Sequence, residues 1–287
     1  MNVVSGSDVG GSTTKIVGYQ ADGTLIAMGK VEAADPLTSA YGALGKFINE
    51  NTLALTDVCQ IILTGVGVSL FTKDVYGIPT RTVNEFEAIG LGGLALSGKK
   101  EGLIVSMGTG TAFVRAGQNG SVHIGGSGVG GGTVLGLCSK LCGATSFRTV
   151  VEMSRGGQLG RVDLNIEDIS KGVIATLPPD TTASNFGKMA DGATAQDITL
   201  GILNMTFQTI GMMAVFACRN DKVKDVILTG TLTQVPYAKH VFEALQKMHK
   251  VNFIIPPNAI YATATGAALS YITAVHKGLT RQADCAC

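Results

Sequence analysis

Two short segments of the sequence combine glycines, hydroxyl side chains and charge in a pattern that suits phosphate chemistry. "DVGGSTTK" (8–15) and "MGTGT" (107–111) each lie between two apolar runs. Glycine lets the backbone approach an anion closely, and consecutive backbone N–H groups form an anion-binding nest. Either segment alone is also consistent with an ordinary hairpin turn. Their occurrence as a pair predicts a phosphate site.

Hydroxyl groups and one lysine add the donors that such a site needs. The residues expected to contact phosphate in these two segments are Gly10, Gly11, Ser12, Thr13, Lys15, Gly108, Thr109, Gly110 and Thr111. Asp8 cannot bind a phosphate directly, because like charges repel. Its place beside the turn is explained if Mg²⁺, or the water shell of Mg²⁺, lies between the carboxylate and the phosphates.

A third glycine-rich segment, "IGGSGVGGGTVLGLCSKL" (124–141), ends in an apolar helical pattern. The N-terminus of a helix binds anions, although a flexible loop would have the same composition. The segment matches neither GxGxxG after a first strand nor GxxxxGK[ST], which argues against a Rossmann site and a P-loop. The residues expected to contact a bound phosphate here are Gly130, Gly131, Gly132 and Thr133.

The elements that must position these segments recur in the same order along the chain. The first series is three short strands over residues 2–34, a helix at 37–51, a buried strand at 60–65, and a strand at 80–89 that turns into a helix. The second series is three strands over 102–126, a helical insert, a strand at 225–232, a helix at 236–249, a strand at 251–257 and a helix at 259–276. "IILTG" (61–65) also recurs as "VILTG" (226–230). Two βββαβα halves in tandem explain this order.

We therefore predict an α/β fold of two tightly joined halves with a cleft between them. The halves are residues 1–98 and 99–287, and the second contains a helical insert at about 144–200. A long apolar helix is expected at about 196–219. Its segment "ILNMTFQTIGMMAVFAC" (202–218) carries several polar residues, which favours a buried helix over a membrane span.

Composition narrows the class of protein. The chain has 287 residues, is 45% hydrophobic and has a formal net charge of +1, so it can bury a sizeable core and shows no broad nucleic-acid footprint. The N-terminal "MNVVSGSD" has neither the charged region nor the apolar region of a signal peptide. We expect a cytoplasmic protein that binds small molecules, with no nucleic-acid or membrane partner.

The cysteines show no zinc-type CxxC pair. Four of the six, Cys59, Cys138, Cys142 and Cys218, are expected to be small core residues. Cys138 and Cys142 are four residues apart, so a metal or cluster ligand on one helix face stays open as an alternative. Cys285 and Cys287 belong to a C-terminal tail.

Taken together, these segments resemble the acetate kinase/sugar kinase/Hsp70/actin superfamily, and within it the type II pantothenate kinases. The segments that carry the resemblance are "DVGGSTTKI" (8–16), "NEFEA" (84–88), "SMGTGTAF" (106–113), "IGGSGVGGGTVLGL" (124–137), "TTASNFGKM" (181–189), "ILTGTL" (227–232) and "ATATGAALSY" (262–271). "ASNFG" is the most specific of them. The resemblance implies duplicated ribonuclease H-like (actin/Hsp70-like) halves with an interdomain nucleotide cleft. It also implies ATP and Mg²⁺ as cofactors, phosphorylation of pantothenate for coenzyme A biosynthesis, and a homodimer built on the long helix.

The resemblance assigns roles to individual residues. It implies that Glu85 in "NEFEA" is the catalytic base, with Glu87 as the competing residue and a helix-terminal charge as the plainer explanation. It implies that Gly230 and Thr231 lie at the adenine end of the cleft. Phe147 falls where the family has an aromatic residue near the nucleotide, although core packing explains a phenylalanine equally well.

Two positions depart from the family pattern. Ala112 stands where the family usually has serine, and His123 where it usually has arginine, the two residues that hold the acid substrate. A histidine binds a carboxylate as a cation only when protonated and lacks the bidentate fork of arginine. Arg115, on the facing strand of the same hairpin, is a candidate to compensate. The departures leave open an altered acceptor, a weaker enzyme or neutral drift.

Two other functional classes stay open on the same fold. One is a sugar or amino-sugar kinase, although such enzymes normally use an aspartate base, and one large branch carries a Cys/His zinc motif that this sequence lacks. The other is a non-kinase: a nucleotide-gated binding protein, or an ATPase activator with an iron–sulfur cluster. Such an activator would need exposed cysteines that bridge two subunits.

Overall fold

The computed structural model describes residues 2–11, 13–32, 35–170 and 178–280 of the chain. Its first half is built on a five-stranded sheet. The strands are β1 (Val3–Val9), β2 (Thr13–Gln20), β3 (Leu25–Glu32), β4 (Val58–Thr64) and β5 (Thr80–Thr82), in the order β3-β2-β1-β4-β5. The first three strands are antiparallel, and β4 and β5 continue the sheet in parallel with β1.

The second half repeats this topology strand for strand. Its strands are β6 (Gly102–Met107), β7 (Thr111–Gly117), β8 (Gly120–Ser127), β11 (Asp225–Thr229) and β12 (Asn252–Ile254), in the order β12-β11-β6-β7-β8. Strands β6, β7 and β8 are antiparallel, and β11 and β12 are parallel to β6. The prediction of duplicated α/β halves is confirmed.

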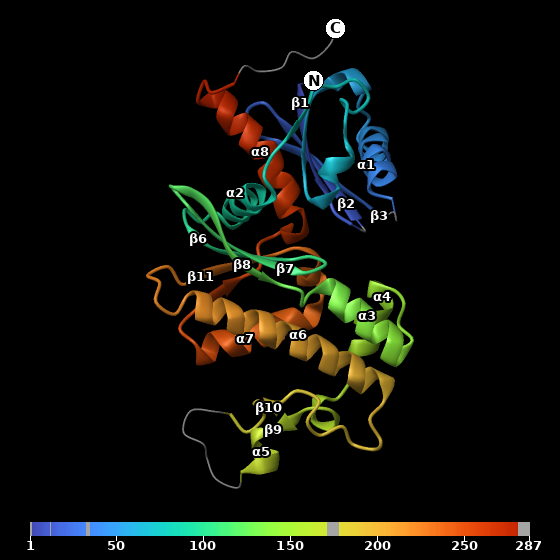
Figure 1. Ribbon diagram of the computed structural model, residues 1–287, viewed down its shortest axis with the longest axis vertical. Coiled ribbons are helices and arrows are strands. Elements are labelled where there is room, and N and C mark those ends of the chain that lie inside the picture. The colour runs from blue at the N-terminus through green and yellow to red at the C-terminus, as the bar shows by residue number, and fades with distance from the viewer. Residues whose placement is uncertain (1, 12, 33–34, 171–177, 281–287) are drawn as a thin grey trace.

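The helices cover both faces of each sheet (Figure 1). They are α1 (Pro36–Glu50), α2 (Glu85–Ser97), α3 (Gly131–Cys142), α4 (Phe147–Ser154), α5 (Ile166–Ile169), α6 (Ala195–Ala217), α7 (Pro236–Met248) and α8 (Ala262–His276). α1 packs on the outer face of the first sheet. α3, α6 and α7 pack on the outer face of the second sheet, and α2 and α8 lie between the two sheets.

The two halves exchange their last helices. α8 packs against the first sheet, whereas α2 packs against the second. The exchanged helices touch backbone to backbone, because a side chain at Gly92 would overlap the carbonyl group of Ala262 and one at Gly266 would overlap that of Ala88. This contact joins the halves directly beside the cleft. A division of the chain at residue 98 stays a prediction.

The start of α2 differs from the strand expected over residues 80–89. That strand ends at Thr82, and the helix begins at Glu85. The side chain of Asn84 caps it by accepting hydrogen bonds from the backbone N–H groups of Phe86 and Glu87, at 2.9 and 3.3 Å. This local N-cap outweighs the β propensity of the preceding residues. It places Glu85 in the first turn, at the edge of the cleft.

The segment between α3 and α6 is not entirely helical. It contains α4 and α5, but also the short strands β9 (Leu164–Asn165) and β10 (Thr182–Ser184), which pair with each other.

α6 is long and apolar enough to cross a membrane by length and composition alone. Most of its inner side, including Phe207 and Ile210, is buried in the core of the second half. The expectation of a buried helix is met.

Candidate functional site

The three glycine segments meet in one hollow between the halves, with a volume of about 490 Å³. β1 and β6 occupy equivalent central places in the two sheets, so the turns that follow them face each other across the cleft. The predicted residues that line the hollow are Gly10, Gly11, Thr13, Lys15, Gly108, Thr109, Gly131, Gly132, Phe147 and Thr231. Ser12, which was expected to belong to this set, lies outside the described residues.

Several predicted phosphate ligands instead hold the glycine segments together. The hydroxyl group of Thr111 donates to the carbonyl of Val129 at 2.8 Å, and that of Thr133 donates to the carbonyl of Gly128 at 2.9 Å. A Cβ atom on Gly130 would lie 2.6 Å from the carbonyl oxygen of Thr109, closer than real side chains approach. These residues pack behind the residues that line the hollow and so fix its shape. Gly110 is equally constrained, because a Cβ atom there would lie 2.9 Å from the carbonyl oxygen of Ser127.

The start of α3 offers fewer free donors than expected. The N–H group of Gly131 donates to the carbonyl of Gly108 at 2.8 Å, and that of Gly132 donates to the carbonyl of Thr109 at 2.9 Å. These two amides are therefore not free anion donors, contrary to the expectation from sequence. Their absent side chains let α3 approach the second turn closely. Gly230 has a similar role, with φ of +87° and no room for a Cβ atom beside the backbone of Met107.

Asp8, Lys15 and Glu85 form a charged group beside the hollow, and Lys15 is the member that lines it. Asp8 lies opposite Lys15 in the β1–β2 pair, and the Lys15 ammonium is 3.4 Å from the Asp8 carboxylate. Burial raises the pKa of Asp8 above its ordinary value, and the charge of Lys15 opposes this. Burial also raises the pKa of Glu85, with the negative charge of Asp8 as the second cause and Lys15 opposing both.

Glu85 and Glu87 point to different sides of α2. Glu85 is half-buried and interacts electrostatically with Asp8 and Lys15, whereas Glu87 is exposed and lines a separate surface hollow on the outer side of α2. Side chains two positions apart on an α-helix point about 200° apart around the helix axis, so only one of this pair faces the cleft. The geometry therefore favours Glu85 as the proton acceptor at this site.

The residues around Asp8 fit a hydrated Mg²⁺. The hydroxyl group of Thr64 is buried without a hydrogen-bond partner, and Thr64 lies beside Asp8 in the parallel β1–β4 pair. A buried carboxylate next to an unpartnered hydroxyl is the oxygen-rich environment that Mg²⁺ prefers. No group of three or more His, Cys, Asp or Glu side chains that could hold a metal occurs among the described residues. The remaining ligands would have to come from water and phosphate.

Ala112 and His123 lie close together on the side of the second sheet that faces α2. Ala112 is opposite Gly126 in the β7–β8 pair, and a Cβ atom on Gly126 would lie 3.8 Å from Nε2 of His123. The His123 ring stacks on Phe86, with ring centroids 3.8 Å apart and planes inclined by 6°. Phe86 directly follows Glu85 in the sequence. The two departures from the family pattern thus share one place beside the candidate base.

Arg115 lies on the opposite face of the sheet. Successive strand residues alternate between faces: Val114 packs on the α2 side and Phe113 on the α6 side, which is also the side of Arg115. The Arg115 guanidinium forms an ion pair with Asp221, just beyond α6. The idea that Arg115 compensates for the missing arginine is therefore not supported by its position.

Sequence reasoning missed part of the lining. The additional residues are Lys30, Glu32, Leu135, Thr145, Ser146 and Gln234. A signal for two of them existed: in the β2–β3 hairpin, Lys30 falls opposite Lys15 and Glu32 opposite Thr13 once the register is known. The others come from loops and helices whose approach to the cleft depends on tertiary packing.

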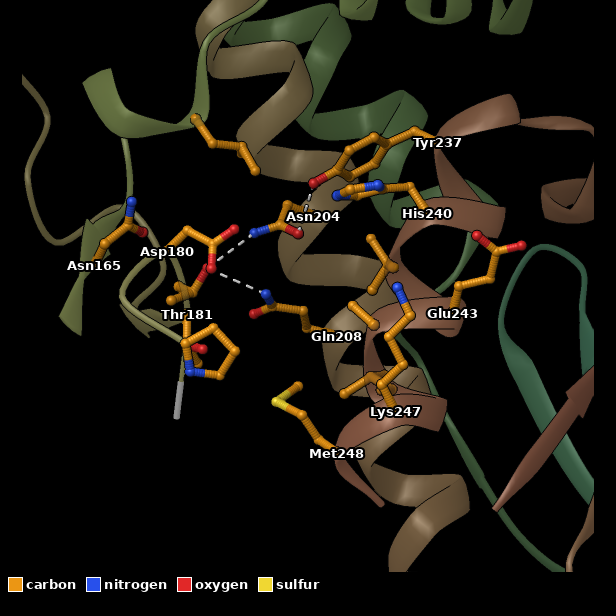
Figure 2. Close-up of a pocket in the computed structure, with 16 residues that line it drawn as sticks. Asn165, Asp180, Thr181, Asn204, Gln208, Tyr237, His240, Glu243, Lys247 and Met248 are labelled. Carbon is orange, nitrogen blue, oxygen red and sulfur yellow. Dashed lines mark hydrogen bonds between the residues drawn. The ribbon is translucent and has the colours of Figure 1, made fainter. Parts of the chain in front are cut away.

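The "ASNFG" segment lies away from the glycine turns. Asn185 and the backbone N–H of Phe186 donate to the buried carboxylate of Asp163, at 3.2 and 2.9 Å. Asn204 of α6 donates to the same carboxylate at 2.7 Å and accepts from the Tyr237 hydroxyl at 3.1 Å. The network ties the insert to α6 and α7. Asn204 and Tyr237 of this network also line a second hollow, of about 570 Å³, between the insert and α7 (Figure 2).

The described cysteines behave as core residues. Cys59, Cys138 and Cys218 are buried, and Cys142 is half-buried. Burial raises the pKa of Cys138 to about 12, so it stays a thiol. Cys285 and Cys287 lie outside the described residues.

Comparison with known proteins gives one family and two kinds of relative. The family model described as Fumble matches residues 102–251. A type II pantothenate kinase of Bacillus cereus (strain G9842) is 25% identical over 92% of this chain and 97% of that protein. Two solved structures have a TM-score of 0.68. The first is the ADPNP-bound activator of the 2-hydroxyisocaproyl-CoA dehydratase from Clostridium difficile, 16% identical over 96% of this chain and 97% of that one. The second is component A of the Acidaminococcus fermentans (R)-2-hydroxyglutaryl-CoA dehydratase, 17% identical over 98% of this chain and all of that one. At this identity, the two structures support the fold alone.

Proposed function

The chain belongs to the Fumble family, and on that premise we propose that it transfers the γ-phosphate of ATP to the hydroxyl group of pantothenate, giving 4′-phosphopantothenate for coenzyme A biosynthesis. The observation that carries the proposal is the placement of Glu85. It lies at the start of α2 and interacts electrostatically with Asp8 and with Lys15, which lines the hollow that the glycine segments form. The similarity to a type II pantothenate kinase over 92% of the chain supports pantothenate as the acceptor.

The residues at the cleft have different roles in phosphoryl transfer. Gly11 and Thr109, on the two facing turns, receive the phosphates, and Lys15 supplies positive charge. The Glu85 carboxylate accepts the proton of the acceptor hydroxyl as the new P–O bond forms and the bond to ADP breaks. Its raised pKa makes it a stronger base than an exposed glutamate. Phe147 and Thr231 line the part of the hollow that we assign to the nucleoside.

Asp8 and Thr64 are the residues that would hold Mg²⁺, most directly through its water shell. When bound, the ion neutralises charge on the phosphates. The role of this chain is to keep the Asp8 carboxylate at the end of β1, 3.4 Å from the Lys15 ammonium. We place the enzyme in the cytoplasm.

An iron–sulfur activator on the same fold has less support from the site. Cluster ligands are thiolates, yet Cys138 is buried as a thiol and Cys142, its neighbour on α3, is only half-buried. A sugar kinase is not favoured by any specific contact. ADP release, measured with ATP, Mg²⁺ and a panel of pantothenate, pantetheine and hexoses, tests all three functions. Release that depends on a hexose, or does not depend on any acceptor, would contradict the proposal.

The acceptor shell gives a prediction for pantothenate affinity. Ala112→Ser combined with His123→Arg should lower the KM for pantothenate by about tenfold or more, because a bidentate contact to a carboxylate contributes roughly 1.5–3 kcal/mol. The kcat should change little, because the base is untouched. Steady-state kinetics over a range of pantothenate concentrations gives both constants.

Val122→Arg is the matched control, since Val122 is an exposed neighbour of His123 and points to the other face of the sheet. It should leave the KM unchanged. A wild-type KM that is already low, and that the double substitution does not improve, would mean that another group holds the carboxylate. The departures at these two positions would then be neutral.

We also propose a homodimer built on α6. Near its C-terminal end this helix exposes apolar surface: Phe216 is 61% exposed, and it lines a surface hollow together with Met212 and Val215. Apolar side chains exposed along one helix are typical of subunit contacts. Phe216→Glu should weaken self-association about tenfold or more, measured by sedimentation equilibrium. Leu279→Glu, at an exposed apolar residue after α8, is the control and should have no effect. A monomeric wild type would contradict this proposal.

A further inference from the structure

A second lysine lies directly beside Lys15 on the face of the first sheet that lines the cleft. In the β2–β3 pair, Lys30 is opposite Lys15, and Glu32 is opposite Thr13 of the first glycine turn. Residues that oppose each other in an antiparallel pair project from the same face of the sheet. Like charges in such a pair are destabilising unless something neutralises them. Each lysine here has its own acid.

The two acids differ in how firmly they hold their lysines. Asp8 and Lys15 are both largely buried, with side chains 13% and 11% exposed. Lys30 and Glu32 form a shorter ion pair of 2.7 Å, but the Glu32 side chain is 70% exposed and that of Lys30 is 31% exposed. The hydrogen bond from Lys30 lowers the pKa of Glu32, so the carboxylate is ionised. An ion pair this exposed contributes little to stability, and exchanging it for another anion is inexpensive.

Lys30 is also within the hollow and not merely near it. It lines the same 490 Å³ hollow as Gly11, Lys15 and Thr109, the residues expected at the phosphates. The hollow continues outward past Glu32 toward Phe147 on the opposite half. A nucleotide polyphosphate in this space would carry several negative charges past two adjacent lysines.

We propose that Lys30 is a second phosphate-binding cation of the nucleotide site, and that Glu32 is the intramolecular competitor that it leaves when the nucleotide binds. The inference rests on the nucleotide-binding part of the proposed function and adds a residue from the third strand, outside the glycine segments. Glu32 keeps Lys30 neutralised in the empty cleft, which offsets its repulsion from Lys15. The phosphate chain then replaces Glu32 as the partner.

The test is ATP, ADP and adenosine affinity by calorimetry, with four variants of the full chain. Lys30→Met should weaken ATP and ADP about tenfold, the loss expected for one charge-assisted contact, and should leave adenosine unchanged. Glu32→Gln should tighten ATP, because Lys30 is then free. In Lys30→Met/Glu32→Gln that gain should disappear.

Lys46→Met is the matched control. This substitution also removes one positive charge close to Lys30, since the Lys46 ammonium donates to the Lys30 carbonyl at 3.4 Å. Lys46 itself belongs to α1 and pairs with Glu50 at 3.8 Å. It should leave ATP affinity close to that of the wild type. Circular dichroism checks folding, and Lys30→Gln replaces Lys30→Met if the latter misfolds.

Three results would overturn the proposal while leaving the kinase function standing: Lys30→Met equal to Lys46→Met, Glu32→Gln weakening ATP, or a gain from Glu32→Gln that persists in the double variant. Equal weakening of ATP and adenosine would also overturn it, because Lys30 would then contact the nucleoside. A wild type that binds no ATP would overturn both this inference and the proposed function.

Discussion

Glu85→Gln is expected to lower kcat by about 10²-fold or more while leaving ATP affinity nearly unchanged. Removing a general base costs this much because the hydroxyl proton has no acceptor as the P–O bond forms. Glutamine keeps the size and polarity of the side chain, so the nearby hollow stays intact. Steady-state kinetics gives kcat, and calorimetry gives the affinity for ATP.

Glu87→Gln is the matched control, because Glu87 is the same residue type in the same helical turn but exposed. It should keep near-normal turnover. If Glu87→Gln is inactive and Glu85→Gln is active, the assignment of the base is wrong. The rate of the wild type should fall as the pH drops through the raised pKa of Glu85, since only the ionised carboxylate accepts a proton.

The thermal stability of Glu85→Gln separates loss of the base from loss of the fold. Because its pKa is raised in the folded state, Glu85 binds a proton more tightly there than in the unfolded chain. The free energy of unfolding therefore falls as the pH rises from the ordinary to the raised pKa. The variant lacks this group. Above pH 7, the Tm of the nucleotide-free variant should therefore be equal to or higher than that of the nucleotide-free wild type. A lower Tm would point to structural damage.

Gly11→Val is expected to weaken ATP binding about 10- to 100-fold without unfolding the protein. Nothing lies within 4 Å of the position that a Cβ atom would take on Gly11, and its φ is not in the left-handed region. A valine can therefore fit in the empty protein. Its methyl groups would occupy the space that the phosphates need. Calorimetry measures the affinity, and circular dichroism checks the fold.

Gly42→Val is the control for this substitution. Gly42 lies on the exposed side of α1 and likewise has nothing within 4 Å of its would-be Cβ atom. It should bind ATP like the wild type. Unchanged ATP affinity in a folded Gly11→Val protein would remove the first turn from the phosphate site. Gly130→Val is less informative, because clashes with Thr109 and Gly110 would disturb the loops themselves.

The sequence by itself determined the strands, most helices and the duplication. In each half, the strands appear as alternating or fully apolar runs separated by glycine turns. These signals come from residues that are neighbours in the sequence. The repeat of "IILTG" as "VILTG", together with the recurring order of elements, indicated that the two halves share a topology, which the matching strand orders confirm. The glycine turns were also visible, because only glycine allows such close backbone approach.

Only the tertiary structure decided which groups at these turns remain free. Thr111, Thr133, Gly131 and Gly132 carry the expected donors, but their hydroxyl or N–H groups bond to carbonyls of the neighbouring glycine segments. Whether a donor faces a ligand or another loop depends on how segments far apart in the sequence pack. Local composition does not contain that information.

The faces of strands and helices were decided in the same way. Arg115 and His123 are close in sequence, yet the pleat places Arg115 with Asp221 and His123 with Phe86. The N-cap at Asn84 turns Glu85, rather than Glu87, toward Asp8 and Lys15. The register of β2 and β3 brings Lys30 into the hollow. The sequence supplies the chemical groups, but their use depends on register and packing, because a shift of one residue turns a side chain to the opposite face.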